Sequence, residues 1–194
     1  MIENMFNMET FIIIIIFYLL GSISFAVLSS KLFNLPDPRS FGSKNPGATN
    51  VMRSGNKLAA FFTLSGDILK GYIPIIYMLN QGFHIYELYL LSFMILIGHC
   101  YPITLRFKGG KGVATSLGIL FALAPIVASL VVLTWLIIYY LFKVSGVSAL
   151  IGFLLLPFFM FLMGSDSNMI MISFANVVFI YLTHKQNILE FMSN

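Results

Sequence analysis

The stretch from Val113 to Phe142 runs for 30 residues without a charged side chain. A single α-helix of this length would extend roughly 45 Å at about 1.5 Å per residue, which exceeds the ~30 Å hydrocarbon core of a bilayer. Pro125 lies near the middle of the stretch, where it would interrupt a continuous helix. The sequence therefore predicts two shorter membrane spans that meet near Ala124 and Pro125.

Similar apolar runs fill most of the chain. Only 9% of the 194 residues are charged, against roughly 25% in a soluble domain. We expect one all-α integral membrane domain over residues 1–194, because closed barrels show short alternating strands and the sequence has no such pattern. The first run has no basic residue before it and no small-residue cleavage site, so it is interpreted as a permanent span and not as a signal peptide. With the pair inside 113–142, seven spans are expected, the others at 9–33, 58–79, 86–105, 146–163 and 169–183.

The basic residues predict the orientation of these spans, because Lys and Arg concentrate in cytoplasmic loops. Most of the 11 Lys and Arg residues lie in segments 34–57 and 106–112, at Lys143, and in the tail with Lys185. The turns at 80–87 and 164–168 contain none. This distribution places the N-terminus outside, the C-terminus in the cytoplasm, and the basic segments together on the cytoplasmic face.

Two of the basic segments have the composition of an anion site. Segment 41–53 combines glycines, small hydroxyl and amide side chains, and Arg53, which can bind a phosphate through two parallel hydrogen bonds. Segment 106–112 is a glycine-rich turn with lysines before a predicted helix, which can direct backbone amides and positive charge at an anion. Its spacing is not that of a Walker A loop. Each segment could instead be an ordered surface loop or an anchor beside anionic lipid heads.

The histidines give weaker indications. His99 and Cys100 are adjacent and so point about 100° apart on a helix, which argues against a catalytic Cys–His dyad. We expect His99 to support helix packing or a loop, and His84 to lie in an outer turn without a role. His184 and Asn187 are three residues apart on one predicted helical face, where they are either site members or interfacial anchors.

Asp67 and Lys70 lie inside the second predicted span, where charges are costly and usually face the bundle interior. Their spacing allows them to neutralise each other, either as a structural pair or as a polar wall behind the anion site. The single cysteine allows no internal disulfide. We see no metal-binding motif, no carboxylate pair and no His–Asp acyltransferase motif, and we expect neither a metal nor a cofactor.

Seven sequence blocks together resemble the bacterial acyl-phosphate:glycerol-3-phosphate acyltransferase family, PlsY. They span the chain in the order Gly21–Phe25, Pro36–Arg39, Gly42–Val51, Asp67–Gly71, Gly98–His99, Lys108–Thr115 and His184–Ile188. One position departs from the family pattern, since Lys44 stands where the family usually has glycine. If this position requires a positive φ, lysine adds strain there, and it also offers a further contact to phosphate.

The resemblance implies seven helices in the bacterial plasma (inner) membrane, with the active site on the cytoplasmic face. It implies transfer of a fatty acyl group from acyl phosphate to glycerol 3-phosphate, which gives lysophosphatidic acid and phosphate in an early step of phospholipid synthesis. The expected partners are these two substrates, membrane lipid and the enzyme that makes acyl phosphate, but no nucleic acid. Because acyl phosphate is already activated, a covalent enzyme nucleophile is dispensable.

The resemblance also implies roles for individual residues. Ser43 and Arg53 would bind phosphate, and Lys111 with the Gly109 and Gly110 amides would bind the acyl-phosphate group. Lys111 would also stabilise the charge that develops in the reaction, and His184 and Asn187 would orient glycerol 3-phosphate. The proton of the attacking hydroxyl would go to His184 or to substrate phosphate. The expected catalytic residues are thus Ser43, Arg53, Lys111, His184 and Asn187, and the expected further phosphate contacts are Gly42, Asn45, Gly47, Thr49, Asn50, Lys108, Gly109, Gly110 and Ser145.

Two other classes of function fit parts of the pattern. An anion transporter would explain the buried charges, but it requires polar groups along a path through both leaflets, and here they crowd one predicted face. A non-catalytic membrane scaffold would not need two basic loops that contain glycine.

Overall fold

The computed structural model describes residues 8–192, and the regular elements in this part of the chain are all helices, with no strand. The elements in chain order are α1 (Met8–Gly21), α2 (Phe25–Leu32), α3 (Ala48–Met52), α4 (Lys57–Asn80), α5 (Ile85–Leu91), α6 (Phe93–Cys100), the 3-10 turn η2 (Ile103–Leu105), α7 (Val113–Leu123), α8 (Pro125–Phe142), α9 (Ser145–Leu154), α10 (Leu156–Leu162), α11 (Ser167–Thr183) and α12 (Lys185–Met192).

Five helical segments of the described chain are long and apolar enough to cross a membrane: 8–32, 57–80, 85–105, 125–142 and 145–162. Two shorter apolar helices, α7 and α11, complete the set. The all-α prediction is confirmed, and so is the division of 113–142, because α7 ends and α8 begins at Ala124–Pro125. The count of seven spans stays a prediction.

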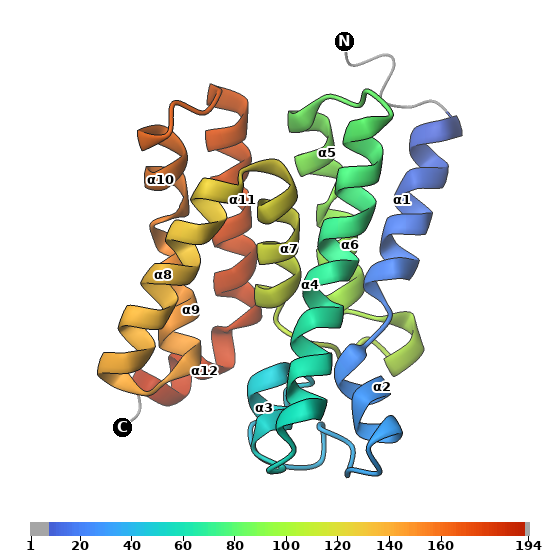
Figure 1. Cartoon of the computed structure of the whole chain (residues 1–194), viewed down its shortest axis with the longest axis vertical. Helices are drawn as coiled ribbons and strands as arrows, with labels where there is room; N and C mark the ends of the chain where they lie inside the picture. Colours follow the sequence, from blue (N-terminus) through green and yellow to red (C-terminus); the bar gives the residue numbers. More distant parts are fainter. Residues whose placement is uncertain (1–7, 193–194) are drawn as a thin grey trace.

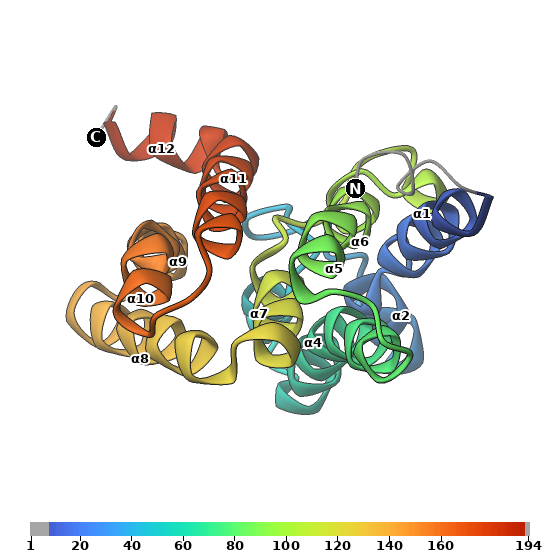
Figure 2. The same ribbon diagram turned by 90° about the horizontal axis from the view of Figure 1, so that it is seen from above.

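The polar segments gather at one end of the bundle. Figure 1 shows α2, α3, α12, the connection before α7 and the α8–α9 connection at this end. The α4–α5, α7–α8 and α10–α11 connections lie at the opposite end, together with the start of α1. Viewed along the bundle, α7 lies between a group that contains α1, α4, α5 and α6 and a group formed by α8 to α11 (Figure 2). We call the first of the two ends the polar end.

The span expected at 9–33 is found at 8–32, but its helix is interrupted between Gly21 and Phe25, which the sequence did not predict. Gly21 lies so close to α6 that a Cβ there would overlap the carbonyl oxygen of Ile95. Ser24 then restarts the helix as the N-cap of α2, where its Oγ accepts a hydrogen bond from Val27 N–H. A run of small residues thus permits close helix packing and also a change of direction.

A break in a membrane helix leaves backbone carbonyls without their usual N–H donors. Side chains from other elements donate hydrogen bonds to these carbonyls instead. Lys70 Nζ donates to the carbonyls of Gly21 at 3.1 Å and Ile23 at 2.7 Å. Thr104 Oγ1 donates to the carbonyl of Ser22 at 2.8 Å. The break is therefore held by α4 and by η2, and it orients the segment that enters the polar end.

Candidate active site

A cavity of about 400 Å³ lies at the polar end, between three segments that are distant in the sequence. Segment 43–45 forms one part of its wall, residues from 100–111 form another, and residues from 182–186 form the third. Among the described residues that line it are four lysines and no acidic side chain. The lining residues are Ser43, Lys44, Asn45, Cys100, Tyr101, Phe107, Lys108, Gly109, Gly110, Lys111, Leu182, Thr183, Lys185 and Gln186.

This cavity unites the two basic segments that sequence reasoning selected. Of the expected site residues, six line it directly: Ser43, Asn45, Lys108, Gly109, Gly110 and Lys111. The others lie on the surrounding elements. The structure shows where these side chains are, and their roles in binding and catalysis stay predictions.

Asn50 shapes the loop that carries Ser43. Its side chain is buried, and Nδ2 donates to the carbonyls of Pro38 at 2.7 Å and Phe41 at 3.1 Å. Its Oδ1 accepts from the Ser43 backbone N–H at 3.0 Å. Both amide hydrogens are therefore committed inside the loop. Asn50 thus holds the turn that carries Ser43, and its expected contact to substrate phosphate stays a prediction.

Gly42 and Arg53 lie together beside this turn. Gly42 has φ +56°, and a Cβ there would overlap Asn50 Oδ1, so only glycine fits. The same Cβ position lies 3.2 Å from Arg53 Cδ and 3.3 Å from its Nη1, which places the guanidinium over the turn. Arg53 is exposed and does not line the cavity described above. It is adjacent to the Ser43 turn, as its predicted role requires.

Segment 41–53 also contacts α9, through Thr49 in α3. Thr49 Oγ1 and Ser145 Oγ lie 3.2 Å apart, so two predicted phosphate contacts from distant parts of the chain form a pair. Gly47 is the N-cap of the five-residue helix α3, and its N–H donates to the Asn45 carbonyl at 2.9 Å. This amide is thus hydrogen-bonded within the loop, and the expected phosphate contact through Gly47 stays a prediction.

The acid in this region is neutralised locally. Arg39 Nη2 lies 2.7 Å from Asp37 Oδ2, and this contact holds the pKa of the Asp37 carboxyl below its usual value. Asp37 is the only acidic residue in segment 34–57. The one carboxylate of this segment is therefore already paired with a cation of the same segment.

Gly109 and Gly110 of segment 106–112 pack closely against the end of α6 and donate their backbone N–H groups to it. The N–H of Gly109 donates to the Cys100 carbonyl at 3.0 Å, and the N–H of Gly110 donates to the His99 carbonyl at 3.0 Å. A Cβ on Gly110 would overlap the His99 ring. Both amides thus already have backbone acceptors, and their expected contact to acyl phosphate stays a prediction. The first-turn amides of α7 have no acceptor within the helix and lie directly after this segment.

A buried charge cluster lies behind the same segment. Lys70 Nζ and Asp67 Oδ1 are 2.8 Å apart, which is the neutralising pair that their spacing predicts. His99 Nδ1 lies 3.6 Å from Asp67 Oδ1 and 3.2 Å from Thr115 Oγ1. The cluster joins α4, α6 and α7, and it places the His99 ring against Gly110. It thus supports the loop, as expected for His99, while Cys100 takes no part.

Lys111 is held from two directions. Its Nζ donates to Asn187 Oδ1, and its carbonyl accepts from Thr183 Oγ1 at 2.9 Å. The contact between Lys111 and Asn187 joins two predicted catalytic residues that are 76 positions apart. Sequence reasoning missed Thr183, because it belongs to the apolar α11 pattern. Its position directly before His184 was the available signal.

His184 is buried, with 3% of its surface exposed, just beyond the end of α11. Burial and the nearby Lys111 charge lower the pKa of His184 to about 4, so the ring is neutral at physiological pH. Its Nδ1 lies 2.8 Å from the Ile180 carbonyl oxygen, which can only accept a hydrogen. Nδ1 therefore carries the proton, and Nε2 keeps its lone pair for a substrate hydroxyl.

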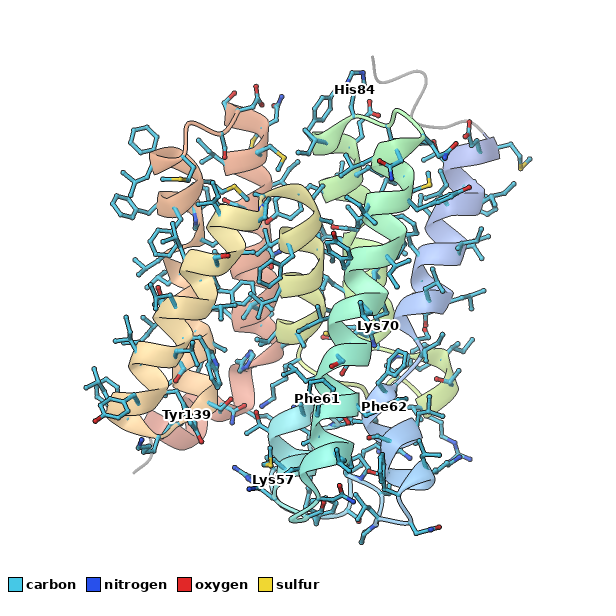
Figure 3. The ribbon with its side chains drawn as sticks, in the orientation of Figure 1. Lys57, Phe61, Phe62, Lys70, His84 and Tyr139 are labelled. Carbon is cyan, nitrogen blue, oxygen red and sulfur yellow. The ribbon has the colours of Figure 1, made fainter. Side chains whose placement is uncertain are left out.

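His184 and Asn187 share the first turn of α12 and not the last turn of α11, because α11 ends at Thr183 and the His184 carbonyl accepts from Ile188 N–H at 3.1 Å. The two side chains are neighbours. A Cβ on Gly146 would lie 3.9 Å from Asn187 Cγ and 4.0 Å from His184 Cδ2. By contrast, Figure 3 shows His84 at the opposite end of the bundle, as expected for an outer turn.

Further residues of the cavity wall were not singled out from the sequence. Lys185 and Gln186 directly follow His184, and Tyr101, Phe107 and Leu182 add an apolar part to the wall. A cavity with both lysines and apolar side chains suits a ligand that combines an anion with a hydrocarbon part.

Comparisons with known proteins agree with this geometry. A family model described as "Glycerol-3-phosphate acyltransferase" matches residues 11–194. The chain is 44% identical over 187 residues to the glycerol-3-phosphate acyltransferase of Dechloromonas aromatica, covering 96% of this chain and 94% of the relative. It is 48% identical over 176 residues to that of Herminiimonas arsenicoxydans, covering 88% and 85%.

The fold also matches a solved structure. The crystal structure of PlsY (YgiH), described as an integral membrane glycerol 3-phosphate acyltransferase in its glycerol 3-phosphate form, has a TM-score of 0.88 and 34% identity. The match covers 95% of this chain and 92% of that one. A second structure of PlsY, in its lysophosphatidic acid form, has a TM-score of 0.87 and 33% identity.

Proposed function

The chain belongs to the glycerol-3-phosphate acyltransferase family, and from this we propose that it transfers a fatty acyl group from acyl phosphate to glycerol 3-phosphate, with lysophosphatidic acid and phosphate as products. The observation that carries the proposal is the convergence of segments 43–45, 100–111 and 182–186 on one acid-free cavity with four lysines. Both proposed substrates carry a phosphate group of about −1.5 to −2 charge. A site for the pair needs several cations close together.

The acyl group reaches the acceptor in a single displacement. A hydroxyl oxygen of glycerol 3-phosphate forms a bond to the carbonyl carbon of the acyl phosphate. The bond between that carbon and the phosphate oxygen breaks, and phosphate leaves with the electron pair. Lys111, oriented by Asn187 and Thr183, stabilises the negative charge that develops on the carbonyl oxygen or on the leaving group.

The hydroxyl proton has two possible acceptors, and we favour substrate phosphate over His184 because of their pKa values. His184 has a pKa of about 4, which makes it a weak base, whereas a phosphate monoester has a second pKa of about 6. His184 Nε2 instead accepts a hydrogen bond from the hydroxyl and orients it. Ser43, Arg53, Lys108 and Ser145 bind the phosphate groups in this proposal.

We further propose that the chain crosses the bacterial inner membrane seven times, with its active site on the cytoplasmic face and its N-terminus outside. The gathering of basic segments at the polar end supports this orientation. The cytoplasmic partner that follows from the chemistry is an enzyme that makes acyl phosphate.

The choice of donor is tested with purified protein in lipid, glycerol 3-phosphate and three alternative donors: acyl phosphate, acyl-CoA and acyl carrier protein. Formation of lysophosphatidic acid is followed by mass spectrometry. Of the three donors, we expect only acyl phosphate to give product. We also expect the kcat of a Lys111→Ala variant to fall about 100-fold or more while the variant remains folded. Product from acyl-CoA or acyl carrier protein, but not from acyl phosphate, would contradict the donor assignment.

A further inference from the structure

Lys44 has a backbone that favours glycine, with φ +55°. A residue with a Cβ is strained in this left-handed region, and such strain persists where the surroundings fix the backbone, often at functional sites. The surroundings do so here, because Lys44 N–H donates to the Phe41 carbonyl at 2.9 Å and Ser43 N–H donates to Asn50 Oδ1 at 3.0 Å. Glycine would adopt this turn without strain, so the local fold gives no reason for a lysine.

The position of the side chain supplies a reason. Lys44 is exposed and lines the cavity between Ser43 and Asn45. It is one of the four lysines of the acid-free wall, with Lys108, Lys111 and Lys185. The acid of its own loop, Asp37, already pairs with Arg39. Lys44 therefore adds positive charge at the water-exposed rim of the cavity.

The two proposed substrates reach this rim differently. Acyl phosphate has a hydrocarbon tail and enters from the membrane, whereas glycerol 3-phosphate is soluble and enters from water. A charge at the exposed rim of a cleft concentrates a soluble counter-ion and raises its association rate, and the effect falls with ionic strength. Lys111, which is half-buried and held by Asn187, is placed for the chemical step instead.

We propose that Lys44 captures the phosphate group of glycerol 3-phosphate and so lowers the KM for this substrate, at the cost of a strained backbone. The proposal rests on the proposed function, and it adds a residue that acts on substrate encounter and not on acyl transfer.

The test compares wild-type protein with Lys44→Gly in lipid, with acyl phosphate as donor. We expect the KM for glycerol 3-phosphate to rise about three- to fivefold in Lys44→Gly, the size of one exposed charge contact. The kcat and the KM for acyl phosphate stay within about twofold. The difference in KM shrinks when KCl is raised from about 0.1 M to about 1 M, because the Debye length falls from about 10 Å to about 3 Å.

Two variants control this comparison. Lys44→Arg keeps the charge and retains the wild-type KM. Lys143→Gly is the matched control, because Lys143 is also an exposed lysine with a left-handed backbone, at φ +57°. It lies over the Tyr140 ring at 4.7 Å and does not line the cavity, so its replacement leaves the KM unchanged.

Lys44→Gly unfolds at no lower temperature than wild type, because relief of strain offsets the added freedom of the unfolded chain.

Each contrary result has a distinct meaning. An active wild type and an unchanged KM in Lys44→Gly would overturn the role of Lys44 and leave the proposed function intact. A fall in kcat with an unchanged KM, or an equal rise of KM in Lys143→Gly, would also overturn it. A wild-type protein that makes no lysophosphatidic acid from acyl phosphate would overturn the proposed function and this role with it.

Discussion

The buried ring of His184 carries its proton on Nδ1, because Nδ1 lies 2.8 Å from the Ile180 carbonyl, and its pKa is about 4. A base with this pKa is fully deprotonated above about pH 5, so it would give a rate that is flat from pH 5 to 8 and falls as pH drops through about 4. Substrate phosphate would give a rate that falls as pH drops through about 6. The two acceptors are therefore separable by the position of the acid limb.

We predict that wild-type protein and His184→Gln both lose kcat with an apparent pKa near 6, while His184→Gln has a higher KM for glycerol 3-phosphate. The measurement is a pH–rate profile of each protein, with His84→Gln as the control, since His84 lies at the other end of the bundle (Figure 3). An acid limb near pH 4 in wild type that is absent from His184→Gln would instead make His184 the base.

The sequence predicted which residues lie at the site, but not which of their N–H groups are already hydrogen-bonded within the protein. Ser43, Lys108 and Lys111 line the cavity, as their segment compositions suggested. Asn50 and Gly110 have suitable chemistry, yet their N–H groups are taken by carbonyls that only the tertiary fold brings near. The backbone at position 44 was visible in the sequence, because the lysine in place of glycine drew attention to a positive φ there, and the structure has one.

At the scale of elements, the Lys70 ammonium group binds one carboxylate and two backbone carbonyls from different parts of the fold. It pairs with Asp67, and it donates to the carbonyls of Gly21 and Ile23 at the break between α1 and α2. Removing the ammonium group would leave a buried carboxylate and two carbonyls without this partner. Breaking a buried ion pair from one side typically costs about 3–5 kcal/mol.

We therefore predict that Lys70→Met lowers the free energy of unfolding by about 3–5 kcal/mol, seen as a fall in Tm of roughly 10 °C in detergent. Lys57→Met is the control, because Lys57 is an exposed lysine at the start of the same helix (Figure 3) and its replacement changes stability by less than about 0.5 kcal/mol. Adding Asp67→Asn to Lys70→Met recovers part of the loss. Equal Tm values for Lys70→Met and Lys57→Met would contradict this account of the break.

The two helix breaks differ in how visible they are in the sequence. Pro125 has no backbone N–H to continue a helix, so the α7–α8 division could be predicted from one residue and a length. The α1–α2 break depends on Gly21 packing against Ile95 and on Lys70 reaching two carbonyls, which are contacts between distant segments. Small residues alone indicated close packing there and not a change of direction.

At the scale of the whole molecule, the basic segments share one end of the bundle. The chain crosses the bundle an even number of times between one basic segment and the next, as their charges suggested. The proposed orientation predicts that Ser40→Cys, in segment 34–57, reacts with a membrane-impermeant maleimide only after cells are lysed. Ser167→Cys, at the opposite end, reacts in intact spheroplasts; both positions are exposed, whereas native Cys100 is buried. Labelling of Ser40→Cys in intact spheroplasts would reverse the orientation.

The central claim is that the cavity at the polar end transfers an acyl group from acyl phosphate to glycerol 3-phosphate. Its most direct test is the release of inorganic phosphate from acyl phosphate by the purified protein, measured with and without glycerol 3-phosphate and compared with lysophosphatidic acid in the same samples. The account predicts phosphate and lysophosphatidic acid in equal amounts, only when glycerol 3-phosphate is present. Phosphate release that is independent of the acceptor, or no release at all, would contradict it.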